Sequence, residues 1–257
     1  MTRTHVHADQ PATARRPLTR RALTATLAAG MALGTLAAVA PAAGAQEHEI
    51  GGAIRVEYLA AAQANGQSPE DFFGPALSPE TPIARDGRFQ VFQNDQSIYW
   101  APGVAGGRAN QIGGAIRDRW EAEKWEVGPL GYPTTREWSG KPSSRTEKVA
   151  RGNHFEGGTI YAVPDEGTFV TWGLIRDAWW RDGAEKGSFG LPVGPEKATD
   201  DGWVQEFEGG TIRVTREGRV SFDWNYSPDE KPSTPSPEAG LGDQLADMVA
   251  GWIDQFS

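Results

Sequence analysis

The sequence predicts an α+β fold made of three tandem copies of one short unit: a helix, a Gly/Pro turn and a β-hairpin. Three observations predict it. An Ile followed four residues later by an aromatic residue recurs at nearly constant spacing, a turn segment ending in Pro follows it, and a Phe-Glu-Gly-Gly-Thr-Ile segment comes after the turn. Such a unit is too small to bury its own apolar face, so neighbouring units must pack together.

The first element of each unit is expected to be a short amphipathic helix. Its Ile occupies positions 54, 116 and 175, and the aromatic residue four places later is Tyr58, Trp120 or Trp179. Side chains four residues apart share one face of a helix, and charged residues surround each pair in the sequence. Because these aromatic residues recur in every unit, we expect them to belong to the core.

The second element is expected to be a turn, because Gly permits unusual φ values and the following Pro ends regular pairing. The second unit carries Leu130-Gly-Tyr-Pro133 and the third carries Phe189-Gly-Leu-Pro192. Ala76-Leu-Ser-Pro79 is interpreted as a degenerate first copy that has lost its Gly. Residues 64–72 are an insertion of the first unit.

The third element is expected to be a β-hairpin around a Gly-Gly pair, at residues 154–161 and again at residues 206–213. A type I′ turn needs positive φ at both central residues, which predicts that conformation for the two glycines. In the first unit Asn94-Asp95 replaces Gly-Gly. These residues tolerate the left-handed region well, so we expect the same local geometry there.

The order of these three motifs resembles the LGFP repeat family of secreted actinobacterial cell-wall-associated proteins. The resemblance covers roughly residues 50–224 and rests on Gly-x-Ile-x3-Trp, the two turns and Phe-Glu-Gly-Gly-x-Ile. It implies attachment to arabinogalactan or a related wall glycan. Family members often carry the repeats beside mycoloyltransferase, amidase or other hydrolase domains. None accompanies the repeats in these 257 residues, so we expect a non-catalytic protein.

The predicted domain organisation places a signal peptide before the repeats and a tethered helix after them. Four Arg at positions 15, 16, 20 and 21 precede an Ala-rich apolar stretch and Ala43-Gly44-Ala45, which is typical of a cleavable signal. The modest hydrophobicity leaves a twin-arginine and a Sec signal equally open. The predicted segments are 1–45 (signal peptide), 50–111, 112–170 and 171–226 (repeats), 227–239 (Pro/Ser-rich linker) and 240–257 (amphipathic helix).

The charge balance excludes strongly anionic partners. Removing residues 1–45 takes five Arg and one Asp from 25 basic and 34 acidic residues, which leaves 20 basic and 33 acidic residues, a net charge near −13. Nucleic acid and anionic lipid surfaces would repel such a protein, whereas a neutral polysaccharide would not. We therefore expect a cell-wall polysaccharide as partner, no nucleic acid and no stable membrane span after processing.

Catalytic and metal sites find little support in the residue types. The chain has no Cys, no Gly-x-Ser-x-Gly segment and, after residue 45, only His48 and His154. We expect no metal and no cofactor. His154 is interpreted as a strand residue. Paired carboxylates of a secreted wall hydrolase stay open as an alternative, because acidic residues are too abundant to single out a pair.

Candidate glycan-binding residues are the Trp side chains that occur in one unit only, because flat rings stack on the apolar faces of sugars while charged groups bind the hydroxyls. A role in packing stays open for each of them. The repeated Arg is a further candidate, although pairing with a carboxylate is the commoner role of such a residue. The candidates are Trp125, Trp138, Trp180, Trp203, Arg117 and Arg176.

The last segment carries a second hypothesis, in which the protein is an envelope adaptor. Leu241, Leu245, Trp252 and Phe256 recur at helical spacing and predict one apolar stripe on a helix with an acidic opposite face. An interfacial membrane helix would carry Lys or Arg there. Docking on the repeats of the same chain and docking on a partner protein both stay open.

Overall fold

The computed structural model describes residues 48–225, so the predicted signal peptide, the Pro/Ser-rich linker and the residues of the terminal apolar stripe lie outside the described residues. The fold is α+β, as predicted, but each unit contributes a four-stranded antiparallel sheet where the sequence indicated only a hairpin. The helices are α1 (Gly52–Ala64), α2 (Pro69–Phe73), α3 (Gly114–Ala122) and α4 (Gly173–Asp182). Short 3-10 turns lie at Ala105–Gly107, Trp125–Val127 and Ala184–Lys186.

The three sheets are antiparallel meanders that follow one another along the chain. Sheet I comprises β1 (Thr81–Pro82), β2 (Arg88–Phe92), β3 (Gln96–Trp100) and β4 (Asn110–Gly113). Sheet II comprises β5 (Trp138–Ser139), β6 (Arg151–His154), β7 (Gly158–Val163) and β8 (Gly167–Trp172). Sheet III comprises β9 (Lys197–Ala198), β10 (Gly202–Phe207), β11 (Gly210–Thr215) and β12 (Val220–Trp224).

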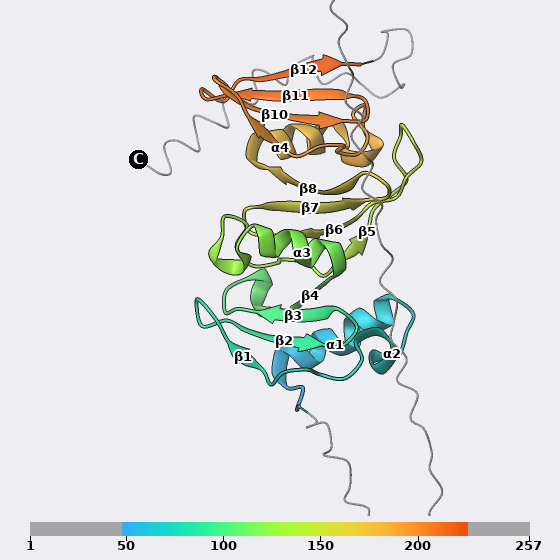
Figure 1. The fold of residues 1–257 in the computed structure, drawn as a ribbon, viewed down its shortest axis with the longest axis vertical. Helices are drawn as coiled ribbons and strands as arrows, with labels where there is room; N and C mark the ends of the chain where they lie inside the picture. Colours follow the sequence, from blue (N-terminus) through green and yellow to red (C-terminus); the bar gives the residue numbers. More distant parts are fainter. Residues whose placement is uncertain (1–47, 226–257) are drawn as a thin grey trace, which may run out of the picture. The chain divides into compact units, whose positions relative to one another are not determined.

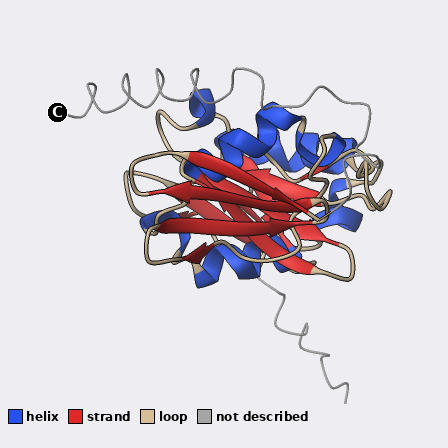
Figure 2. Cartoon of the chain, turned by 90° about the horizontal axis from the view of Figure 1, so that it is seen from above, coloured by secondary structure: helices blue, strands red, loops and turns tan. Residues whose placement is uncertain are grey.

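Helices and sheets alternate as layers, so that α3 lies between sheets I and II and α4 lies between sheets II and III (Figure 1). Seen from above, the strands of the sheets overlie one another (Figure 2). The middle sheet contributes side chains to two cores, because successive side chains of a strand point to opposite faces. In β7, Ile160 packs with α3 while Tyr161 and Val163 pack with α4. The neighbours therefore share cores, as expected for small repeats.

The repeated aromatic residues connect each helix to its turn. Trp120 and Trp179 are fully buried, and their indole nitrogens donate to the carbonyl oxygens of Gly131 and Gly190 at 3.1 and 2.8 Å. A buried indole N–H needs such an acceptor. The interpretation of these rings as core is confirmed, and the hydrogen bond explains why an aromatic residue at this position is followed by a Gly-containing turn.

The first turn lies three residues earlier in the chain than the sequence pattern predicts. Isolated bridges pair Pro133 with Phe155, Pro192 with Phe207 and Ala76 with Phe92, so Ala76 occupies the place of the two prolines. The first copy of the turn is thus residues 73–76, and its Gly74 has φ 68°, close to φ 65° of Gly131. The first unit has therefore kept the turn Gly. Pro79, three residues after Ala76, resembles the Pro of the motif in sequence but does not occupy its place in the structure.

The hairpins form where predicted, but the turns are not type I′. The two-residue loops are Glu156-Gly157 and Glu208-Gly209, and neither loop glycine has positive φ. Close approach is what requires Gly157, whose added Cβ would lie 2.1 Å from the Pro129 carbonyl oxygen. Its N–H donates to the Leu130 carbonyl at 2.9 Å, so the hairpin tip is docked on the Leu-Gly-Tyr-Pro turn.

The first hairpin reaches the same docked position with a different loop. Phe92 pairs with Gln96, so three residues separate the strands where the other units have two, and Asp95 has φ 57°. The Asn94 N–H donates to the Phe73 carbonyl at 2.9 Å and fills the role of Gly157. The expectation of equal local geometry is therefore wrong for the loop, although the contact that it makes is preserved.

A buried side-chain amide joins each sheet to the segments that precede it in the chain. Gln90, Asn153 and Gln205 hold equivalent positions two residues before the hairpin Phe and are completely buried. Each amide nitrogen donates to two backbone carbonyls at 3.0–3.1 Å, which gives the buried amide hydrogens their acceptors. The acceptors are Glu49 and Ser78 for the first, Gln111 and Thr135 for the second, and Val170 and Gly194 for the third.

The face of sheet III turned away from α4 is polar. Its register places Glu206 beside Thr211 and Asp223, and Val204 beside Arg213 and Ser221. Ion pairs connect Arg213 with Asp223 at 2.8 Å and Lys197 with Glu206 at 3.2 Å. The opposite face instead contributes Phe207, Ile212 and Val214 to the core around α4.

Candidate functional site

Two Trp side chains of the described residues are exposed, one on α4 and one at the cleft beside its beginning. Trp180 lies near the end of that helix and is 39% exposed, and Trp203 on β10 is 40% exposed. Neither position carries Trp in the other units: Glu121 corresponds to Trp180, and Arg151 to Trp203. Exposed indole rings that the scaffold does not repeat are candidates for ligand contact.

Trp180 belongs to a cluster that unites three of the predicted candidates. The guanidinium of Arg176 lies 4.8 Å from its ring centroid, and the His154 ring meets it edge-on at 5.2 Å. Trp138 lies 5.2 Å from His154 on the other side. Burial and the neighbouring Arg176 lower the pKa of His154, so this imidazole is neutral at pH 7 and accepts or donates hydrogen bonds without charge.

Trp138 is half-buried and fills space in sheet II that corresponds to the space filled by Phe89 in sheet I. In sheet I, Phe89 stacks on Tyr99 at 5.2 Å. The position corresponding to Phe89 in sheet II is Gly152, where an added Cβ would lie 2.6 Å from the Trp138 ring. Trp138 packs edge-on against Tyr161 at 5.3 Å instead. Its ring therefore supports the sheet and leaves Trp180 as the exposed member of the cluster.

Trp125 and Arg117 lie apart from this cluster. Trp125 is half-buried, packs edge-on against Trp120 at 5.2 Å and has φ 57°. Arg117 forms an ion pair with Asp95 at 2.5 Å, which links α3 to the first hairpin loop. Of the other two candidates, Arg176 lies on α4 in the Trp180 cluster, and Trp203 lies in the cleft described next.

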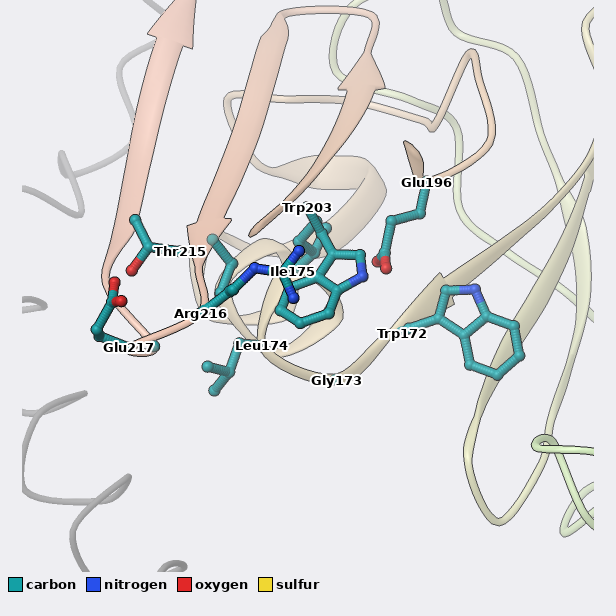
Figure 3. A pocket seen from close by; sticks show the side chains of 11 residues that line it. Trp172, Gly173, Leu174, Ile175, Glu196, Trp203, Thr215, Arg216 and Glu217 are labelled. Atoms are coloured by element: carbon teal, nitrogen blue, oxygen red, sulfur yellow. The ribbon is translucent and has the colours of Figure 1, made fainter. Parts of the chain in front are cut away.

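A cleft of about 430 Å³ opens between the beginning of α4 and sheet III (Figure 3). Trp172 and Trp203 flank it, Leu174 lines it, and the Glu196 carboxyl points between the two indole rings. Arg216 lies over Trp203, with its guanidinium carbon 5.7 Å from the ring centroid. A volume of this size accommodates a small ligand or one sugar residue.

The electrostatics of this cleft are set by Glu196. Burial raises the pKa of its carboxyl from the ordinary 4.5 to about 7. Within residues 48–225, no hydrogen bond or ion pair stabilises the carboxylate, which explains why burial is not compensated. Glu217, at the other side of the cleft, has a lowered pKa, chiefly because its carboxylate accepts a hydrogen bond from Thr215.

Trp172 and Glu196 were not selected from the sequence. Trp172 precedes α4 as its N-cap, where α1 and α3 have Gly51 and Gly113, so the criterion of single occurrence would have found it. No sequence signal identifies Glu196, because it differs from the other carboxylates in its burial, which the sequence does not show.

Residues 48–225 contain no group of three or more His, Asp or Glu placed to hold a metal ion. No helix among them has the length and apolar character needed to cross a membrane.

Comparison with known proteins identifies the repeat. Residues 73–128 and 130–187 match the model of the LGFP repeat. A search of curated proteins finds no match. Among solved structures, a streptogramin B lyase is similar at 11% identity and TM-score 0.16, over 60% of this chain and 42% of that protein. The chain thus spans less than half of that structure, and the low TM-score gives this similarity no weight.

Proposed function

Because the chain is an LGFP-repeat protein, we propose that it is a secreted, non-catalytic protein that binds a cell-wall polysaccharide through the surface around α4. Arabinogalactan or a related wall glycan is the proposed partner. The observation that carries this proposal is the exposure of two indole rings near the two ends of one helix: Trp180 lies near the end of α4, and Trp203 lies in the cleft at its beginning.

The contrast between repeated and unrepeated rings supports a binding role. The repeated rings Trp120 and Trp179 are buried and hydrogen-bonded to the turns, so the fold already has its aromatic core without the exposed ones. Arg176 and Arg216 lie against the exposed rings and offer donors for sugar hydroxyls. An indole face for the sugar ring beside a guanidinium for its hydroxyls is an arrangement suited to saccharides.

The charge of the chain supports a neutral ligand. With 34 acidic and 25 basic residues, its formal net charge is −9, which disfavours polyanions. Binding to a neutral glycan by stacking and hydrogen bonds loses little on addition of salt, because it releases few counterions.

The test is retention of the purified protein on arabinogalactan–peptidoglycan at low and high salt, with soluble arabinogalactan as competitor. We expect retention that survives salt and is competed by the soluble glycan. Trp180→Ala and Trp203→Ala should weaken retention without changing the melting temperature. Loss of the folded state would reassign these rings to packing, and no retention by the wild type would favour the adaptor hypothesis, in which residues 240–257 bind a partner protein.

A second candidate function is hydrolysis of the wall glycan, favoured by one observation. Glu196 and Glu217 line the same cleft and have pKa values shifted in opposite directions, which is the relation between acid and base in glycosidases. The supernatant of the retention experiment tests it: release of reducing ends that Glu196→Gln abolishes would establish catalysis.

A further inference from the structure

The cleft between Trp172 and Trp203 contains a carboxyl group that the fold does not use. Glu196 reaches between two indole rings and has no intramolecular hydrogen bond or ion pair within residues 48–225 (Figure 3). Most other carboxylates near the unit interfaces have partners, as Glu57 has Arg136 at 2.8 Å and Glu156 has Arg85 at 2.6 Å. A desolvated carboxyl without a partner is costly unless a ligand supplies one.

We propose that this cleft binds an amino sugar, with the sugar ring against Trp172 and Trp203 and its ammonium group on the Glu196 carboxylate. This inference rests on the proposed function and assigns one chemical class of sugar to one subsite of it. The ligand is a sugar residue with a free, protonated amine. The same residue with an acetylated amine lacks the charge.

The chemistry of the walls supports a cation at this place. The negative face of an indole ring attracts cations, and the guanidinium of Arg216 already lies over Trp203. An ammonium between two such rings and a carboxylate gains from both interactions. The apolar CH face of the sugar covers the remaining ring surface, which the side chain of Leu174 extends.

The charged groups facing the cleft are few. β11 and the turn after it contribute Arg216 and Glu217, the segment before β9 contributes Glu196, and the α4 side contributes only Trp172, Gly173, Leu174 and Ile175. Of the two carboxyls, Glu196 is the one between the indole rings, so its ionisation controls whether this place attracts a cation. Below neutral pH its carboxyl is protonated and must release that proton when an ammonium binds. The affinity for the amino sugar should therefore decrease as the pH is lowered.

The experiment uses two trisaccharides of equal length, β-1,4-linked glucosamine and its N-acetylated counterpart, titrated into the full-length protein by calorimetry in 0.15 M salt. At pH 7 we expect the amino form to bind about tenfold more tightly than the acetylated form. At pH 5.5 the amino form should bind about tenfold more weakly than at pH 7, because only a small fraction of the carboxyl is then ionised. The acetylated form should not change.

Two variants separate this site from general attraction to an acidic protein. Glu196→Gln should remove the preference for the amino form, while Glu206→Gln, on the outer face of sheet III, should keep it with the same change of net charge. Equal affinity for both sugars, or equal loss in both variants, would overturn the proposal. If Glu196→Gln loses the preference but stays on arabinogalactan–peptidoglycan, both proposals stand. If the wild type shows no preference yet is retained, only the amino-sugar site fails.

Discussion

Replacing Glu196 by Gln should stabilise the fold at alkaline pH and leave it nearly unchanged at acidic pH. The pKa of this carboxyl is raised from 4.5 to about 7 in the folded protein, so between these values the folded chain holds a proton that the unfolded chain has lost. A raised carboxyl pKa contributes stability that is fully present below about pH 4.5 and is lost as the pH rises through 7. Gln cannot ionise, so the variant avoids this loss.

The magnitude follows from the size of the shift. At about 1.4 kcal/mol per pH unit, a pKa moved from 4.5 to about 7 corresponds to at most about 3.5 kcal/mol. Glu196 is only partly buried, and solvent screening reduces this to about 1–2 kcal/mol. In a domain of this size, that gain corresponds to an increase in melting temperature of roughly 3–6 °C.

Urea unfolding followed by tryptophan fluorescence at pH 5 and pH 8 measures the effect. We expect a clear gain for Glu196→Gln at pH 8 and a much smaller one at pH 5. Glu217→Gln is the matched control: the lowered pKa of Glu217 means that its carboxylate stabilises the fold above its ordinary pKa, so removing it should give no gain at pH 8. A gain that is the same at both pH values, or absent at pH 8, would refute an uncompensated carboxyl in the cleft.

Three further predictions concern the scaffold and the division of labour. Gly157→Ala should cost about 2–3 kcal/mol in a urea titration, because the new Cβ meets the Pro129 carbonyl, whereas Gly51→Ala, with open space around it, should be nearly neutral. Gln205→Leu should cost about 2–4 kcal/mol, since two buried carbonyls lose their donor, and an unchanged unfolding midpoint would contradict the bridging role of the amide. Deleting residues 240–257 should leave wall retention intact, and a truncated protein that no longer sediments with the wall would place binding in that segment.

The repeat architecture could be predicted from the sequence because its strongest motifs are residues that the contact between helix and turn requires. The Ile–aromatic pair marks the helix, and the Gly of the turn is needed at positive φ where the buried indole of Trp120 or Trp179 binds its carbonyl. Spacing alone misplaced the first turn, since Pro79 resembles the motif while Gly74 performs its function. Which of two similar segments docks on a hairpin depends on tertiary contacts.

The candidate site was less predictable for a related reason. Single occurrence singled out Trp180 and Trp203, the two exposed rings of the described residues, but it also selected Trp138, which replaces a missing Phe in the core. One ring type serves both purposes, and sequence spacing does not report exposure. Glu196 differs from other carboxylates only by its burial and missing partner, neither of which is written in its neighbours along the chain.

The sharing of helices between sheets sets how such an array can change length. Both matched segments, 73–128 and 130–187, run from a turn through one sheet and the helix beyond it. A duplicated segment with these limits would contain the helix that covers the next sheet. It would also contain the buried side-chain amide that binds backbone carbonyls of the preceding segment. It would present to each neighbour the same surface that the neighbour already contacts. Gene duplication can therefore change the number of repeats without requiring a new kind of interface between them.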